Sequence, residues 1–133
     1  MNDAIEELVQ RIGQEAVAAA DDLVGRLLVY AEADEGFILA DLFYIISPIG
    51  SVRFKLCPDS LVSQIRSFWE ECGKLPNSRY WRVMCYIIDG DRFNIDFIYD
   101  HQLREHEDEH DRRTRAVTKY FGEAWVDYPR KPQ

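Results

Sequence analysis

The amino-acid sequence predicts an α+β fold, with an antiparallel sheet of about five strands and helices packed mainly on one face of it. Three segments place apolar residues at the spacing of amphipathic helices. Five others are rich in β-branched and aromatic residues, and the short turns between them favour antiparallel neighbours. The predicted order is α-β-β-β-α-β-β-α. We expect residues 1–133 to form one domain, because the chain is 47% hydrophobic and no Pro/Gly/Ser-rich linker divides it.

The first element is an amphipathic helix over residues 3–22. Its apolar positions recur at helical spacing, and charged or amide side chains fall between them. Gly13 lies inside this helix, where glycine costs about 1 kcal/mol relative to alanine. The apolar positions are Ile5, Leu8, Val9, Ile12, Ala16 and Ala19.

Three strands follow the helix. The first opens at residues 27–31, and the acidic segment 32–36 forms its end and a turn. A second strand covers 37–46, where β-branched and aromatic residues dominate. Residues 47–50 read Ser-Pro-Ile-Gly and predict a turn, and 52–56 predict a short third strand.

A second helix begins near Pro58, since proline is tolerated in a first helical turn. Gly73 is predicted to end it, because glycine often follows the last helical residue. Its apolar stripe consists of Leu61, Ile65, Phe68, Trp69 and Cys72.

Two more strands surround Asp89-Gly90, a dipeptide that is typical of tight hairpins. The first covers residues 80–88. In the second, side chains alternate between the two faces of the sheet. We expect one set to face the core, namely Phe93, Ile95, Phe97 and Tyr99, and a polar set to face solvent, namely Asn94, Asp96 and Asp100.

The last part of the chain is polar at first and apolar later. A charged stretch covers residues 104–115, and apolar residues then continue at helical spacing to Ala124. Residues 126–133 are predicted to be a frayed tail.

Charge and cysteine content indicate which partners and compartment to expect. Acidic residues outnumber basic ones by 24 to 16, which gives a net charge of −8. A negative field disfavours direct binding of nucleic acid and favours a basic protein partner. Three widely spaced cysteines suit a reducing compartment. Without a signal-peptide pattern or a long apolar run, we expect a cytoplasmic protein that does not enter a membrane.

One literal motif points to metal chemistry. His106-Glu107-Asp108-Glu109-His110 matches HExxH, in which two histidines on one helix face bind zinc and the glutamate activates water. The flanking residues are charged, however, and supply no apolar stripe that would seat such a helix beside a cleft. A solvated charged run is therefore the favoured interpretation.

A second set of carboxylates is open to several interpretations. Asp96 and Asp100 are expected on one strand face, near Glu32 or Asp34 of a neighbouring strand. Such a group could form an acid–base pair, hold a divalent cation, dock a basic partner or simply face water. The sequence contains no nucleophile motif, P-loop or dinucleotide-binding motif. We therefore expect no catalytic residue, no metal and no cofactor, and interpret the protein as a binding protein and not an enzyme.

Several segments together resemble a known family. They are the strand at residues 28–32, the Phe68-Trp69-Glu70 helix, the strand at 81–84 and the aromatic strand at 93–100, which ends in Tyr99-Asp100. This set is similar to the YezG-like family of bacterial immunity proteins. The resemblance covers about residues 20–100. It implies a cytoplasmic protein that neutralises a toxin, a nuclease, delivered between competing bacteria.

An acidic inhibitor can imitate phosphate with carboxylates and dock rapidly on the basic surface of a nuclease. Exposed aromatic side chains beside carboxylates are common at protein interfaces, although core filling is the favoured interpretation of most aromatic residues here, and the face of Trp81 stays open. The candidate partner-binding residues are Glu32, Asp34, Glu35, Asp96 and Asp100, three acids of the 105–111 run (Glu107, Asp108 and Glu109), and Trp81 and Tyr99 as aromatic anchors.

Two alternatives remain from the sequence. The order of elements also looks like that of type III secretion effector chaperones, which act as dimers around an extended effector segment. A zinc hydrolase that uses HExxH is the weaker alternative. The sequence leaves the oligomeric state open between monomer and dimer.

Overall fold

A six-stranded sheet forms the centre of the protein, seen in a computed structural model that describes residues 3–46, 51–76, 78–123 and 126–127. The strand order is β5-β4-β1-β2-β3-β6. Neighbours among the five longer strands are antiparallel, which confirms the predicted α+β class. The strands are β1 (Leu27–Asp34), β2 (Phe37–Ile45), β3 (Val52–Leu56), β4 (Val83–Asp89), β5 (Arg92–Ile98) and β6 (Val126–Asp127).

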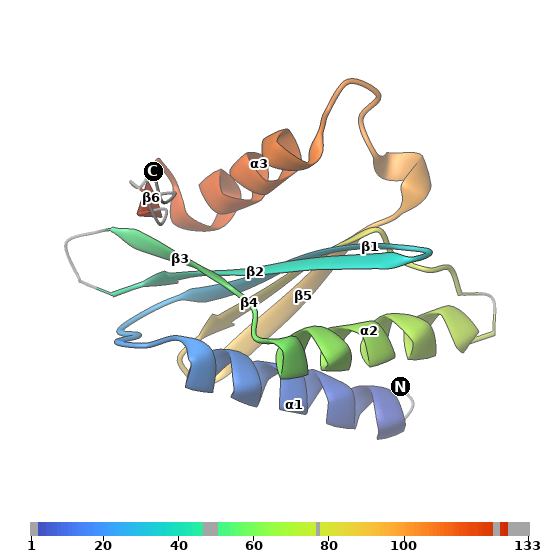
Figure 1. Ribbon diagram of the computed structural model, residues 1–133, viewed down its shortest axis with the longest axis horizontal. Coiled ribbons are helices and arrows are strands. Elements are labelled where there is room, and N and C mark those ends of the chain that lie inside the picture. The colour runs from blue at the N-terminus through green and yellow to red at the C-terminus, as the bar shows by residue number, and fades with distance from the viewer. Residues whose placement is uncertain (1–2, 47–50, 77, 124–125, 128–133) are drawn as a thin grey trace.

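Helices cover both faces of this sheet (Figure 1). The helices α1 (Asp3–Ala19) and α2 (Asp59–Lys74) lie side by side on one face, and α3 (Glu109–Phe121) lies on the other. A short 3₁₀ helix, η1 (Asp100–Gln102), follows β5. Two of the three helices thus share one face, as predicted, and α3 covers part of the face expected to meet solvent.

The larger core lies between the sheet and the pair α1–α2. Alternate residues of the central strands point into it and pack with the apolar stripes of both helices. Strand β1 is buried on both of its faces, because it lies mid-sheet with helices above and below. Its first five residues, Leu27 to Ala31, therefore form a continuous apolar run. The largest fully buried side chains of this core are Trp81, Tyr44, Ile12, Leu27, Leu42, Leu61, Ile65 and Met84.

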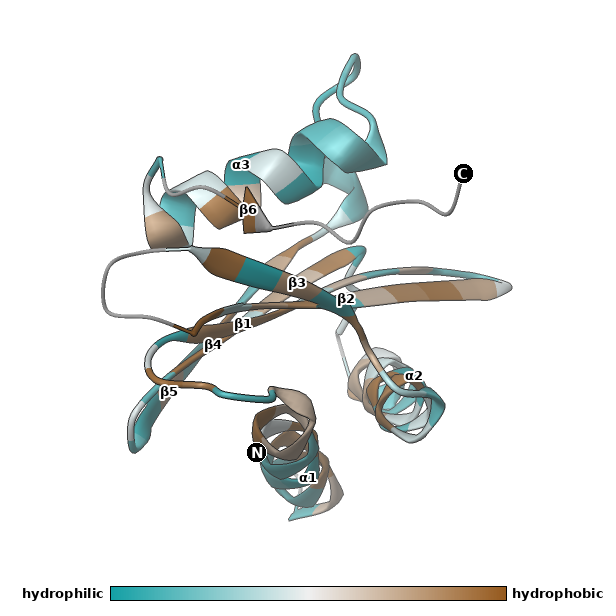
Figure 2. Ribbon diagram, turned by 60° about the vertical axis from the view of Figure 1, so that its left-hand side comes forward, coloured by the Kyte–Doolittle hydropathy of each residue, from teal (hydrophilic) through white to brown (hydrophobic). Residues whose placement is uncertain are grey.

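A smaller core lies under α3. The helix buries only Ala116 and Val117 against sheet residues such as Leu28, Phe43 and Val83. The rest of α3 is strongly polar, and its first turns are the most hydrophilic part of the helix (Figure 2). Burial of apolar side chains therefore contributes only modestly to the packing of α3 against the sheet.

The predicted boundaries differ from the structure in a few places. Helix α1 ends at Ala19, three residues before the predicted end at residue 22. Asp22 has a φ of 62°, which is outside the right-handed helical region. Gly73 does not end α2, which extends through Lys74. A Cβ at Gly73 would lie 2.0 Å from the Tyr80 ring, so close packing requires the glycine. The predicted turn at 47–50 lies outside the described residues.

The chain after α3 also differs from the sequence-based expectation. Val126 and Asp127 pair in parallel with Val52 and Arg53, where a frayed tail was predicted. This pairing covers part of the β3 edge. Residues 128–133 of the predicted tail lie outside the described residues. Strand β5, at the opposite side of the sheet, pairs only with β4 among the described strands.

The β1–β2 turn fixes one end of the sheet. Asp34 pairs with Phe37, so Glu35 and Gly36 alone make the turn. Gly36 has a φ of 92°, a conformation that glycine adopts without strain. Figure 1 shows η1 and the start of α3 at this same end of the molecule. Three acidic segments distant in sequence are thereby gathered together.

Candidate functional site

A buried ion pair holds α3 against the sheet. Arg112 donates hydrogen bonds to both oxygens of Glu32, over 2.6 Å to Oε1 and 3.0 Å to Oε2. The Tyr30 hydroxyl donates a further bond of 2.5 Å to Oε2. Glu32 is 5% exposed. Its carboxylate is thus used inside the protein, and the prediction that Glu32 contacts a partner is wrong for this conformation.

The next residue of α3, Arg113, forms a second ion pair with the sheet. Arg113 lies 3.2 Å from Asp41 on β2 and 3.3 Å from Glu109 on its own helix. Burial raises the pKa of Asp41, and Arg113 acts against that shift. Burial and the Glu32 carboxylate raise the pKa of Tyr30, so Tyr30 keeps its proton and remains a donor. These two pairs position the segment before α3.

An exposed acidic group lies at the end of the sheet defined by the β1–β2 turn. Arg82 is shared by two carboxylates, Asp100 at 2.7 Å and Asp34 at 3.5 Å. One guanidinium thus faces two negative charges, and the Asp100 side chain is 82% exposed. Glu35 is exposed beside Asp34 in the turn. Of the expected carboxylate group, the structure thus brings Asp100 close to Asp34, with Glu35 next to Asp34 in the turn.

The acids of the 105–111 run have separate roles. Glu107 is mostly buried and forms an ion pair with Arg115 over 2.5 Å, so its carboxylate is not available to a partner. Asp108 caps α3 by accepting a bond of 2.8 Å from the Asp111 backbone N–H. That bond lowers the pKa of Asp108. Asp108 stays exposed, and Glu109, bound to Arg113, is half-buried. We name Asp34, Glu35, Asp100, Asp108 and Glu109 the acidic end.

Three apolar side chains lie exposed next to the acidic end. Phe37 and Leu39 of β2 are each 41% exposed, and Leu56 of β3 is 68% exposed. Alternation and register put them on the α3 face of the sheet, where Leu39 pairs with Glu32 and Leu56 with Asp41. We name Phe37, Leu39 and Leu56 the apolar patch. Exposed apolar side chains rimmed by charge are typical of protein interfaces.

The remaining predicted acid, Asp96, is not part of the acidic end. It lies under α3, where it accepts a bond of 2.6 Å from the Tyr120 hydroxyl and lies 3.7 Å from Lys119. The Tyr120 bond is the main cause of the lowered pKa of Asp96. Because β5 ends at Ile98, Asp100 belongs to η1 and not to the same strand face. The predicted pairing of Asp96 with Asp100 is therefore wrong.

The two predicted aromatic anchors also differ in outcome. Trp81 is fully buried, with its ring 5.8 Å from that of Phe97 and 6.3 Å from that of Phe68. It is a core residue, and its predicted role as a surface anchor is wrong for this conformation. Tyr99 is half-buried and lines a groove on the α1–α2 side of β5.

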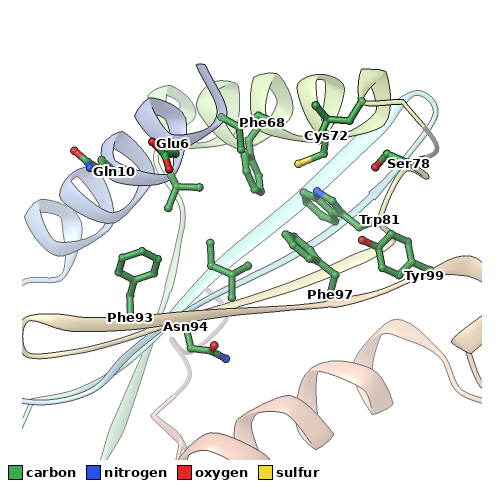
Figure 3. Close-up of a pocket in the computed structure, with 14 residues that line it drawn as sticks. Glu6, Gln10, Phe68, Cys72, Ser78, Trp81, Phe93, Asn94, Phe97 and Tyr99 are labelled. Carbon is green, nitrogen blue, oxygen red and sulfur yellow. The ribbon is translucent and has the colours of Figure 1, made fainter. Parts of the chain in front are cut away.

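That groove has a volume of about 570 Å³ and lies between α1, α2 and β5 (Figure 3). Phe93, Phe97 and Trp81 point into it from the sheet side, and Phe68 and Cys72 from α2. Ile5 and Val9 supply the α1 wall, with Glu6 and Gln10 at its rim. Sequence reasoning missed both the groove and the apolar patch, since each depends on how far the helices extend over the sheet.

The HExxH segment does not form the geometry of a zinc site. Helix α3 begins at Glu109, so His106 and Glu107 precede it and the two histidines do not share a helix face. Glu107, which would activate water, is instead bound to Arg115. Among the described residues, no three His, Cys, Asp or Glu side chains come together as metal ligands.

No helix within the described ranges has the length and apolar character needed to cross a bilayer. Comparison with known proteins gives no match, either to a family model or to a curated protein. The candidate site therefore rests on its own geometry: an acidic end beside an apolar patch, held in place by the buried ion pairs of α3.

Proposed function

We propose that this chain is an immunity protein that binds a cognate antibacterial toxin, a nuclease, and neutralises it through the acidic end. The observation that carries the proposal is the placement of half-buried Asp34 and exposed Glu35 and Asp100 beside exposed Phe37 and Leu39. Carboxylates attract a cationic nuclease surface and speed the encounter. Apolar side chains supply the area that keeps the complex together.

The Arg82 bridge supports this role for the acidic end. A carboxylate that is already matched by its own arginine has little left to offer a partner. Here a single guanidinium serves both Asp34 and Asp100, and Asp100 remains 82% exposed. The pair is therefore held in place while keeping surplus negative charge, as a mimic of neighbouring phosphates requires.

The buried pairs of α3 support it in a second way. Glu32–Arg112 fixes Asp108 and the loop before it relative to β1, because Arg112 also donates a bond of 2.8 Å to the Glu107 carbonyl. A surface whose acids are held before binding loses less conformational freedom on docking.

The proposal requires a toxin gene next to this one, and the test expresses that gene with and without the chain. Wild type should protect cells and inhibit the purified nuclease domain in a one-to-one complex. Glu35→Lys and Asp100→Lys should each lower affinity at least tenfold, mainly through slower association that salt also slows.

Glu123→Lys is the matched control. It makes the same charge change at an exposed position two residues after the C-terminal end of α3. Equal loss of affinity in Glu123→Lys would show that only total charge matters and would contradict a docking role for the acidic end. Full protection by Glu35→Lys and Asp100→Lys would contradict it as well.

A further inference from the structure

Among the strands that the structure describes, the outer edge of β5 has no partner for its main-chain groups. Asp89 and Arg92 flank the two-residue turn of the β4–β5 hairpin, so they form its hydrogen-bonded closing pair. Alternation along the strand then directs the N–H and C=O groups of Phe93, Ile95 and Phe97 away from β4. Within the described ranges no strand pairs with that side.

The same three residues direct their side chains into the groove described above. Figure 3 shows Phe93 and Phe97 pointing from β5 towards α1 and α2. Phe93 is 58% exposed, so the groove wall is not closed at this edge. A strand placed beside β5 would therefore bond to its main chain and put every second side chain into the apolar groove.

Strand β5 lacks the usual protections of a free edge. Its residues, Arg-Phe-Asn-Ile-Asp-Phe-Ile, include neither proline nor lysine. Its one acidic residue, Asp96, points to the α3 side and accepts a bond from Tyr120. The opposite edge of the sheet is different, because β6 pairs with the first residues of β3.

Charge around the groove indicates the character of its occupant. Glu6 lines the rim, Asp3 precedes it by nearly one turn of α1, and Asp91 lies in the hairpin turn. Arg92 is the opposing charge at that end of the strand. Together with the net charge of −8, these acids favour a basic segment over a second copy of this acidic chain.

We infer that the β5 edge and its groove bind an extended segment of a partner protein as an added β-strand. The segment carries alternating apolar side chains, which enter the groove, and basic residues, which meet the acidic rim. This site lies across the sheet from the apolar patch, and the inference does not depend on the identity of a toxin.

The test uses the full chain and a soluble ten-residue peptide with valine at alternate positions and lysine or threonine between them. Two further peptides carry N-methyl groups, one at the valines and the other at the residues between them. Only one of these two sets faces β5, so one peptide should lose at least tenfold in affinity while the other binds like the parent. Hydrogen exchange should slow at Phe93, Ile95 and Phe97 when the parent peptide is bound.

Phe93→Lys should lower peptide affinity at least tenfold, and its exposed position keeps the fold intact. Phe37→Lys, an equally drastic change in the apolar patch, should leave affinity unchanged. Asp100→Lys should also leave it unchanged, which separates this site from the acidic end.

Three results would overturn the inference. The first is an absence of peptide binding, and the second is equal affinity for the two N-methylated peptides. The third is a concentration-dependent dimer in sedimentation that Phe93→Lys abolishes, since that would assign the edge to a second copy of the chain.

Discussion

Glu32 of β1 and Arg112 of α3 form a two-bond ion pair inside the protein, although 80 residues separate them in sequence. Both side chains are mostly buried, at 6% and 15% exposure. Since α3 buries only two apolar residues, this pair and Asp41–Arg113 specify where the helix docks. The acidic end therefore depends on contacts that lie beneath it.

We expect Glu32→Gln to destabilise the fold by about 3 kcal/mol, because it leaves the Arg112 guanidinium buried without its charge partner. The measurement is urea unfolding. Glu35→Gln, at an exposed acid three residues away, is the control and should change stability by less than about 0.5 kcal/mol. A double variant with Arg112→Gln should lose less than the sum of the two single changes. Strict additivity would show that the pair contributes no coupling.

Stability should fall in acid partly through Asp96. Its pKa lies below the ordinary value of 3.8, chiefly because Tyr120 donates a hydrogen bond to it. A lowered folded-state pKa gives stability that is present above the unfolded value and is lost as pH falls through the folded value. Asp96→Asn should therefore be less stable than wild type at pH 7, and the difference should shrink below about pH 4. Unfolding in urea across pH 2–7 measures this.

Glu70→Gln, on the exposed side of α2, is the control for the acid experiment and should follow wild type across the range. A pH-independent difference between wild type and Asp96→Asn would mean that the lost stability comes from packing and not from ionisation.

Gly13→Ala should destabilise the protein, although alanine is the better helix former by about 1 kcal/mol. A Cβ at position 13 would lie 2.6 Å from the Tyr86 hydroxyl, which donates a bond of 2.9 Å to the Val9 carbonyl. Thermal unfolding should show a lower Tm for Gly13→Ala. In a Tyr86→Phe background, where that oxygen is absent, the same change should cost less. A raised Tm in the wild-type background would contradict the close packing.

The three thiols should react slowly in the native protein. Burial raises the pKa of Cys72 to about 11 and of Cys85 to about 12, and it raises the pKa of Cys57 as well. Because the thiolate is the reactive form, a disulfide reagent at pH 8 should modify all three rapidly only in urea. Fast reaction of one thiol in native buffer would place it in a more exposed setting.

The sequence alone predicted most of the fold. Period-2 and period-3.6 patterns and the Asp89-Gly90 turn gave the order of elements and most boundaries within a few residues. The surplus of acids was also visible. Asp100 lies close to Asp34 through Arg82, as the expected proximity of these two acids required, although Asp96 does not join them.

Other predictions failed because they depended on how elements pack. Strand periodicity assigns Glu32 and Asp96 to the polar face of a sheet, but it cannot show that α3 covers that face. Trp81 precedes β4, where no alternation reveals that Phe68 and Phe97 enclose it. The HExxH motif does not indicate where α3 begins. That boundary is set by Asp108, which is the N-cap of the helix.

Backbone preferences and apolar periodicity are local properties, so the amino-acid sequence was enough to predict the longer elements and their order, while its composition gives the negative charge. Which carboxylates remain available to a partner depends on tertiary packing, since a buried acid such as Glu32 is matched by an arginine 80 residues further along the chain. Packing also places the outer edge of β5, which has no partner among the described strands, beside an apolar groove. Both results follow from long-range packing, in which the surroundings of a residue are set by segments distant in sequence.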